Sequence, residues 1–239
     1  MRTTRIITCL LSFACATLCA QETQGEETYK LKVGLSGSVD LCNEMLYYSG
    51  QYQQPGDAFA FLEDPSLGFS SGLTANYYLN GNWSLVGGVR YTEHNIVTGP
   101  IPITDVAGNT SGAAKFVYHT RFLDIPLGIQ YGTNSAKRMM FIANAVVAPG
   151  YAMGEWVELD YTGDGSQGIH DSQHKLQIEN YRSLSVKAEL YAGVGINLNR
   201  FQVQVLPQGR INLLKATSDS PINRRYRTTG VEFRILYNL

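Results

Sequence analysis

The sequence has few charges, few cysteines and no long apolar run beyond its first twenty residues. Charged residues make up 16% of the 239-residue chain, against about 25% in an ordinary globular domain. The formal net charge is -1, which offers no basic surface to attract nucleic acid. After residue 20 no stretch reaches the roughly 18 to 20 apolar residues that a membrane-spanning helix requires. The composition therefore argues against a nucleic-acid partner and excludes a helical membrane protein.

The first twenty residues hold the one long apolar segment. Two arginines precede an apolar run from Ile6 to Leu18, and the segment ends at the small residue Ala20 before a polar stretch. This pattern is typical of a secretory signal peptide. We expect cleavage after Ala20, a short polar segment at 21–28 and a single exported domain at 29–239.

Cysteine is scarce once the signal peptide is removed. Three of the four cysteines lie within residues 1–20, and only Cys42 stays in the mature chain. An intramolecular disulfide and a cysteine-based zinc site are therefore impossible. Acylation at Cys15 or Cys19, as in a lipoprotein, is a weaker alternative because the residues before them fit that signal poorly.

Alternation of apolar and polar residues dominates the mature chain, with the period of two that is typical of half-buried strands. The cleanest run extends from Tyr29 to Leu41, with apolar residues at most odd positions and Lys, Gly, Ser and Asp at the even ones. Similar runs occupy 69–79, 83–92, 116–131, 139–153, 183–197, 201–213 and 230–239. The chain therefore contains about eight strands and no helix signal.

The connections between these runs alternate in length. Tight turns are expected at 80–82, 132–138 and 197–200. Long connections are expected at 43–67, 98–115, 155–181 and 214–226. An even strand count with short turns at one end and long loops at the other is typical of outer-membrane barrels. The sequence thus predicts an all-β fold: an eight-stranded antiparallel up-and-down transmembrane β-barrel with short periplasmic turns and long extracellular loops.

Alternation alone does not say which face lies inside. A soluble periplasmic binder of the lipocalin type has an apolar interior, whereas a membrane barrel has an apolar exterior. The polar face here is rich in Gly, Ser, Thr, Asn and Gln rather than in Lys and Glu. Small polar residues suit a narrow lumen, so we favour the membrane barrel and keep the soluble binder as an alternative.

A few charges of both signs occur on the polar face. They are Lys32, Asp40, Arg90, Lys187, Glu189, Arg210, Glu232 and Arg234. Inside a barrel such charges need partners of opposite sign, because an isolated buried charge is costly. We expect them to form a network that fills the lumen, which suits a structural or surface-interaction protein. A narrow channel or transporter for ions or small apolar compounds is the alternative.

Three segments resemble strands of the small outer-membrane β-barrel proteins of Bacteroidetes-type bacteria, a group that includes the PorT-like barrels and is similar in architecture to OmpA barrels. Residues 121–131 (RFLDIPLGIQY) resemble the aromatic-Leu-acidic-Ile-Pro-Leu strand of that group. Residues 191–196 match its Gly-alternating strand, and residues 230–239 resemble its terminal strand. The resemblance implies a Gram-negative outer-membrane location and a fold, but no particular activity.

The same resemblance implies partners. The terminal strand would be recognised by the barrel assembly machinery through Phe233, Tyr237 and Leu239, although the family's final residue is often Phe. Outer-membrane lipids would surround the barrel, and unknown extracellular or envelope partners would contact the long loops. No cofactor is implied.

Signals of catalysis and metal binding are weak. No G-x-S-x-G elbow is present, so we expect no enzyme and interpret His94, His119, His170 and His174 as exposed loop histidines. The third long loop also carries acidic residues, which with two of these histidines form a candidate cation set. That set is Asp160, Asp164, His170, Asp171 and His174. A solvated loop explains the same residues better than a metal site.

Overall fold

The computed structural model describes residues 30–48, 63–104, 110–133, 138–163, 169–175, 183–216 and 222–239, and their regular structure is entirely β-strand. The expected signal peptide and the segment after it lie outside the described residues. Within the described ranges no helix is long and apolar enough to cross a bilayer. The strands are β1 (Leu31–Tyr48), β2 (Glu63–Tyr78), β3 (Trp83–Thr98), β4 (Ile101–Thr104), β5 (Thr110–Asp124), β6 (Leu127–Gly132), β7 (Met139–Gly163), β8 (Ile169–Lys175), β9 (Leu184–Leu198), β10 (Phe201–Asn212) and β11 (Ile222–Asn238).

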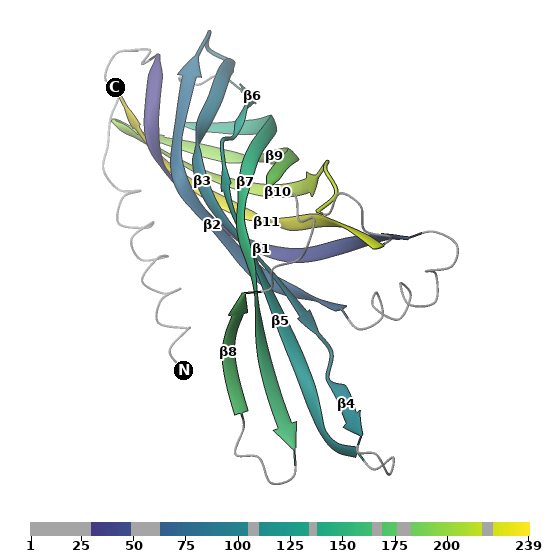
Figure 1. The fold of residues 1–239 in the computed structure, drawn as a ribbon. Coiled ribbons are helices and arrows are strands. Elements are labelled where there is room, and N and C mark those ends of the chain that lie inside the picture. The colour runs from purple at the N-terminus through teal and green to yellow at the C-terminus, as the bar shows by residue number, and fades with distance from the viewer. Residues whose placement is uncertain are drawn as a thin grey trace, which may run out of the picture.

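The strands close into a barrel (Figure 1). The wall consists of β1, β2, β3, β5 together with β6, β7, β9, β10 and β11, and each strand pairs antiparallel with the next. Closure comes from β1 and β11, which pair continuously from Lys32 opposite Asn238 to Tyr48 opposite Ile222. The predicted eight-stranded up-and-down barrel is confirmed.

The fourth wall strand is interrupted, although the alternation at 116–131 predicts one continuous run. β5 ends at Asp124 and β6 begins at Leu127, and Pro126 lies between them. Proline has no N–H to donate to a ladder, so pairing breaks there. The Ile125 N–H still donates to the Pro149 carbonyl at 2.8 Å, which keeps the interrupted strand attached to β7.

Two of the expected long loops are largely strand. The connection predicted at 98–115 contains β4 and the first part of β5, and the connection predicted at 155–181 contains the end of β7 and all of β8. β5 and β7 stay paired as far as Gly112 opposite Gly163. Extending the ladders gives the backbone amides and carbonyls of these segments partners. A four-stranded sheet in the order β4, β5, β7, β8 therefore projects beyond the barrel, downward in Figure 1.

The outer face of the barrel is apolar and the inner face is polar. Leu35, Leu73 and Leu190 are 64%, 64% and 67% exposed on the outside, whereas Gln202 and Gln204 are fully buried inside. A soluble barrel needs the opposite arrangement, because its outer face meets water. The soluble lipocalin-like alternative is therefore wrong, and the outer face is suited to lipid.

Aromatic pairs lie on the apolar outer face of the barrel. Two pairs lie at the short-turn end and one lies toward the long connections. They are Trp83 with Tyr131 (ring centroids 5.1 Å apart), Phe201 with Tyr237 (5.3 Å) and Phe69 with Tyr91 (5.9 Å). Such girdles are typical of the two membrane interfaces of a barrel.

Glycine permits a close approach at the seam where the barrel closes. A Cβ atom added to Gly34 of β1 would overlap the backbone carbonyl of Ile235 in β11. A Cβ atom added to Gly230 of β11 would likewise meet the carbonyl of Val39 in β1. The first and last strands can therefore pair at this spacing only where these side chains are missing.

Candidate functional site

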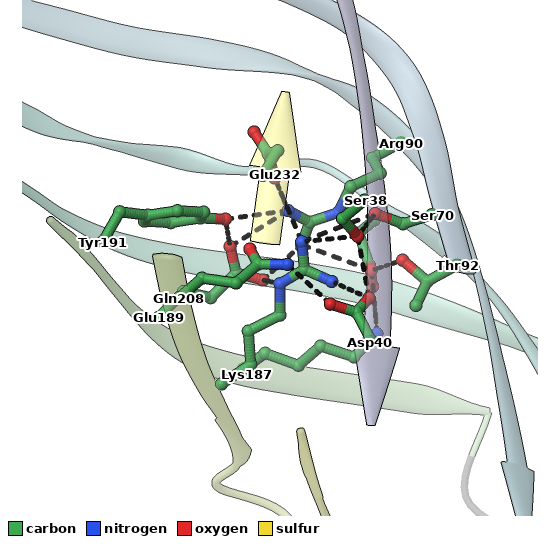
Figure 2. Close-up of polar contacts among 12 residues, drawn as sticks. Ser38, Asp40, Ser70, Arg90, Thr92, Lys187, Glu189, Tyr191, Gln208 and Glu232 are labelled. Carbon is green, nitrogen blue, oxygen red and sulfur yellow. Dashed lines mark hydrogen bonds and ion pairs between the residues drawn. The ribbon is translucent and has the colours of Figure 1, made fainter. Parts of the chain in front are cut away.

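Arg90 on β3 and Glu189 on β9 meet inside the barrel, although their strands do not pair with each other (Figure 2). Arg90 Nη1 donates to Glu189 Oε2 at 3.1 Å and to the Tyr191 hydroxyl at 3.0 Å. Arg90 Nη2 makes a second, shorter contact with Glu189 Oε1, and the Tyr191 hydroxyl donates to Glu189 as well. Bidentate pairs of this kind are strong and geometrically specific, so two separate parts of the wall are tied together across the lumen.

Arg210 on β10 extends the network to the seam strands. Its Nη1 donates to Asp40 Oδ2 on β1 at 2.9 Å, and its Nη2 donates to Glu232 Oε2 on β11 at 3.0 Å. Asp40 also accepts hydrogen bonds from Gln208 Nε2 at 2.6 Å and from Ser38 Oγ at 2.8 Å. The buried Asp40 carboxylate therefore has partners on both oxygens, as a buried charge requires.

Lys187 on β9 reaches toward β5. Its Nζ donates to both carboxylate oxygens of Asp124, at 3.0 and 2.8 Å, and lies 4.0 Å from the centre of the Phe122 ring. Thr92 donates a further hydrogen bond to Asp124 at 2.8 Å. Asp124 is absent from the expected network, but it alternates with Leu123 on the polar face of its run. Its position in the alternation is the signal that would have included it.

The central charge network balances its charges. Its cations are Arg90, Lys187, Arg210 and Arg234, and its carboxylates are Asp40, Asp124, Glu189 and Glu232. All eight residues are at most 3% exposed. Seven of the eight residues named from the sequence lie in it. Lys32 does not, because its Nζ lies 4.8 Å from the Tyr78 ring centroid and 3.4 Å from Asn197 Oδ1 near the short-turn end.

A layer of uncharged side chains fills the lumen between the charge network and the short turns. Gln202 Oε1 accepts hydrogen bonds from the Tyr78 hydroxyl at 3.1 Å and from Gln204 Nε2 at 2.9 Å. Asn76 Nδ2 donates to Gln130 Oε1 at 3.1 Å. These contacts join several strands of the wall, so the periplasmic half of the lumen is also occupied.

An aromatic layer lies on the other side of the charge network. The rings of His94, Phe122 and Tyr226 are mutually in contact, with centroids 5.3, 5.5 and 5.9 Å apart. Phe122 and Tyr226 pack with buried aliphatic residues, among them Ile96. The expectation that His94 and His119 lie exposed in loops is wrong, since His94 is 3% exposed and His119 lies within β5 with its side chain 18% exposed. The alternation of β3 continues to Thr98, beyond the expected end of that run, and its even positions face the lumen.

The candidate cation residues of the third long connection fall in the β7–β8 hairpin. Asp160 lies in register with His170, Leu159 with Asp171 and Val157 with His174, and Asp164 lies outside the described residues. In the described ranges no group of three or more His, Cys, Asp or Glu residues is placed to hold a metal ion.

The sequence matches the family model described as "Outer membrane protein beta-barrel domain" over residues 20–213. The chain belongs to this outer-membrane β-barrel family. Membership agrees with the apolar outer face, and it assigns this barrel to the outer membrane. No curated protein matches the sequence significantly.

Several solved barrels are similar to this one at low identity. Neisserial surface protein A is 14% identical, with a TM-score of 0.41, over 88% of this chain and 97% of its own. OprG from Pseudomonas aeruginosa is 10% identical, with a TM-score of 0.41, over 89% and 99%. The outer-membrane protease OmpT from Escherichia coli is 9% identical, with a TM-score of 0.37, over 92% and 100%. At these values none of the three bears on the activity of this chain.

Proposed function

We propose that this protein is a structural or surface-interaction barrel of the outer membrane that neither conducts solutes nor catalyses a reaction. The carrying observation is the charge network, in which Arg90, Glu189 and Arg210 connect β3, β9 and β10, and Arg210 reaches on to β1 and β11. Balanced and hydrogen-bonded charges have little reason to separate, since breaking a buried pair costs several kcal/mol.

Two further layers support a closed lumen. The aromatic layer of His94, Phe122 and Tyr226 lies on the extracellular side, and the amide layer around Gln202 lies on the periplasmic side. A solute would have to displace all three layers in turn. Eight strands also enclose an interior that side chains can fill.

The projecting sheet supports a surface role. β5 and β7 stay paired well beyond the barrel wall, and β4 and β8 flank them. A rigid sheet on the side of the long connections would present a fixed surface to an extracellular or envelope partner. Replacing residues 98–115 and residues 155–181 with tight turns should leave the barrel folded. Loss of folding would contradict a role confined to surface interaction.

The terminal strand suits recognition by the barrel assembly machinery. Phe233 is 53% exposed and Leu239 is 58% exposed on the outer face, and Tyr237 packs edge-on against Phe201. The assembly machinery could bind these outward-facing side chains of β11 before β11 pairs with β1 and closes the barrel. The strand motif at 121–131 supports a closer relation to the PorT-like barrels of Bacteroidetes-type bacteria.

Swelling of proteoliposomes tests the closed lumen. Vesicles containing the folded protein should swell in small sugars and amino acids no faster than protein-free vesicles. A variant that truncates all three layers, carrying Phe122→Ala, Tyr226→Ala, Arg90→Ser, Glu189→Ser, Gln130→Ala and Gln202→Ala, should swell faster wherever its heat-modifiable migration shows a folded barrel. Swelling of the unaltered protein at the rate of a general porin would favour the channel alternative and overturn the proposal.

A further inference from the structure

A polar pocket lies on the outer face of the barrel rather than in its lumen. Its volume is about 140 Å³, and it is lined by Glu93, His119, Arg121, Trp156 and Glu158. These residues come from β3, β5 and β7, at the point where the projecting sheet leaves the wall. The closed lumen makes no use of any of them.

Arg121 is held in the pocket by two fixed contacts. Its Nε donates to Glu93 Oε2 at 2.9 Å, and its guanidinium carbon lies 4.2 Å from the centroid of the Trp156 ring. The Arg121 side chain is 39% exposed. Among the described residues, its two terminal nitrogens have no hydrogen-bond partner. The pocket therefore offers oriented donors beside an aromatic face.

Glu158 supplies acceptors to the same pocket. Glu158 is 48% exposed, and its Oε2 lies 3.6 Å from His119 Nε2, beyond hydrogen-bond distance. His119 is oriented by Asn95, whose Oδ1 lies 2.8 Å from His119 Nδ1. Neither Glu158 oxygen accepts a hydrogen bond within the part of the chain that the structure describes. A ligand with hydroxyl groups could therefore use both carboxylate oxygens.

An irregularity in β7 builds this pocket. The register against β5 shifts where Arg121 pairs with Gly154 and Phe122 pairs with Ala152, which leaves Met153 as an extra residue. Gly154 has a φ of 139°, a conformation that side chains rarely allow. Before the bulge even-numbered residues of β7 face the lumen, and after it Glu155 does. Bulges at barrel rims re-aim side chains in this way, and here Trp156 is placed on the outer face.

The pocket adjoins the aromatic pair on the side of the long connections. Tyr91 belongs to the girdle on the side of the long connections, and its hydroxyl donates to Glu93 Oε2 at 2.9 Å. Leu123, two residues from Arg121 on the same face, is 45% exposed and belongs to the apolar band. The pocket thus begins where the acyl chains of the outer leaflet end.

We propose that this pocket binds the sugar headgroup of a glycolipid in the outer leaflet. A hydroxyl group both donates and accepts, so a sugar can pair with the Arg121 donors and the Glu158 acceptor together. The exposed part of the Trp156 ring is available to the apolar face of the sugar ring. Because Glu93 and Glu158 line the site, it would contact the hydroxyl groups of the sugar rather than the anionic groups of the headgroup. Because the pocket lies beside Tyr91 and the apolar outer face, we expect the sugar to belong to a membrane lipid rather than to a soluble molecule.

Tryptophan fluorescence tests this proposal, since the chain contains only Trp83 and Trp156. Trp83→Phe leaves one tryptophan in the pocket. This variant, folded in phosphatidylethanolamine and phosphatidylglycerol nanodiscs, should show a saturable change in emission when lipopolysaccharide is included. Trp156→Phe, which keeps Trp83 at the other interface, should show no such change.

The same titration has outcomes that overturn the proposal. No saturable change with lipopolysaccharide would refute binding, and an equal change on adding more phosphatidylglycerol would show a response to charge alone. Soluble oligosaccharide released from the same lipopolysaccharide should bind at least about tenfold more weakly, because the membrane concentrates the attached headgroup. Equal binding of the soluble sugar would overturn the lipid source.

Substitutions identify the residues that bind. Arg121→Ala and Glu158→Gln should each weaken lipopolysaccharide binding about tenfold, the loss expected for a hydrogen bond to a charged group. Arg200→Ala, at the short-turn end of the barrel, is the matched control and should bind as the parent does. Heat-modifiable migration shows which variants fold. Unchanged binding in folded Glu158→Gln and Arg121→Ala, or equal weakening in Arg200→Ala, would contradict the assignment.

Discussion

Replacing Glu189 with glutamine should destabilise the folded barrel by about 3 kcal/mol. Glu189 is 1% exposed, it contacts Arg90 through both oxygens, and its Oε1 lies 3.8 Å from Arg210 Nε. Glutamine keeps the size of the side chain and one acceptor oxygen, but it leaves the four cations of the charge network facing three carboxylates. Removing one partner of a buried ion pair costs about 3–5 kcal/mol.

The lower end of that range applies because other carboxylates stay close to Arg90. Asp124 Oδ2 lies 3.6 Å from Arg90 Nη2, and Glu232 Oε2 lies 3.7 Å from Arg90 Nη1. Arg90→Met together with Glu189→Leu removes both charges at once. The double variant should lose less stability than the sum of the two single variants, by at least about 2 kcal/mol, because an apolar pair can replace a buried ion pair at little cost.

Reversible urea unfolding in phospholipid vesicles measures these free energies, with tryptophan emission and heat-modifiable migration as independent probes. The parent, Arg90→Met, Glu189→Leu and the double variant form a double-mutant cycle, and Glu189→Gln is measured beside it. A loss below about 0.5 kcal/mol for Glu189→Gln, or single-variant losses that simply add in the double variant, would refute the view that these charges are buried and mutually dependent.

Three further predictions concern the wall of the barrel. Leu73→Arg, midway along the lipid face, should lower the free energy of unfolding by about 2–4 kcal/mol, and Leu79→Arg, at the short-turn end, should lower it by about 0–1 kcal/mol. Urea unfolding in vesicles measures both values, and equal losses would contradict the placement of Leu73 in the middle of the bilayer. Gly34→Val should prevent closure, because its side chain would overlap the Ile235 carbonyl; most of the protein should then migrate as unfolded on a gel without heating, and normal migration would contradict the close approach. The Cys42 thiol is 1% exposed, so a maleimide should label it only after unfolding in urea, and rapid labelling of the folded protein would show an open lumen.

Much of the wall could be predicted because each strand has one face toward lipid and one toward the lumen, so apolar and polar residues alternate along the sequence. In β10, Gln202 and Gln204 face the lumen while Phe201 faces outward, as the alternation indicates. The composition of the two faces then places lipid outside, since one face lacks charge. The same alternation predicts which residues belong to the charge network, and it could also have identified Asp124, which lies on the polar face of its run.

The rest depends on contacts between distant segments. The partner of each charge is set by strand tilt and stagger in the closed barrel. Arg90 therefore contacts Glu189, 99 positions away, whereas Lys32 contacts no carboxylate of the charge network. The outer pocket depends on one extra residue at Met153, which reverses the alternation of β7 beyond it. A pattern of period two contains no signal for where such a reversal occurs.

The closed lumen is tested most directly by single-channel recording in planar bilayers. The folded protein should add no steady openings to the membrane at moderate voltage and physiological salt, because the charge network, the aromatic layer and the amide layer each occupy the lumen. Steady openings of uniform size that disappear in Glu189→Ala or Arg90→Ala would contradict the account and show that these charges line an ion path.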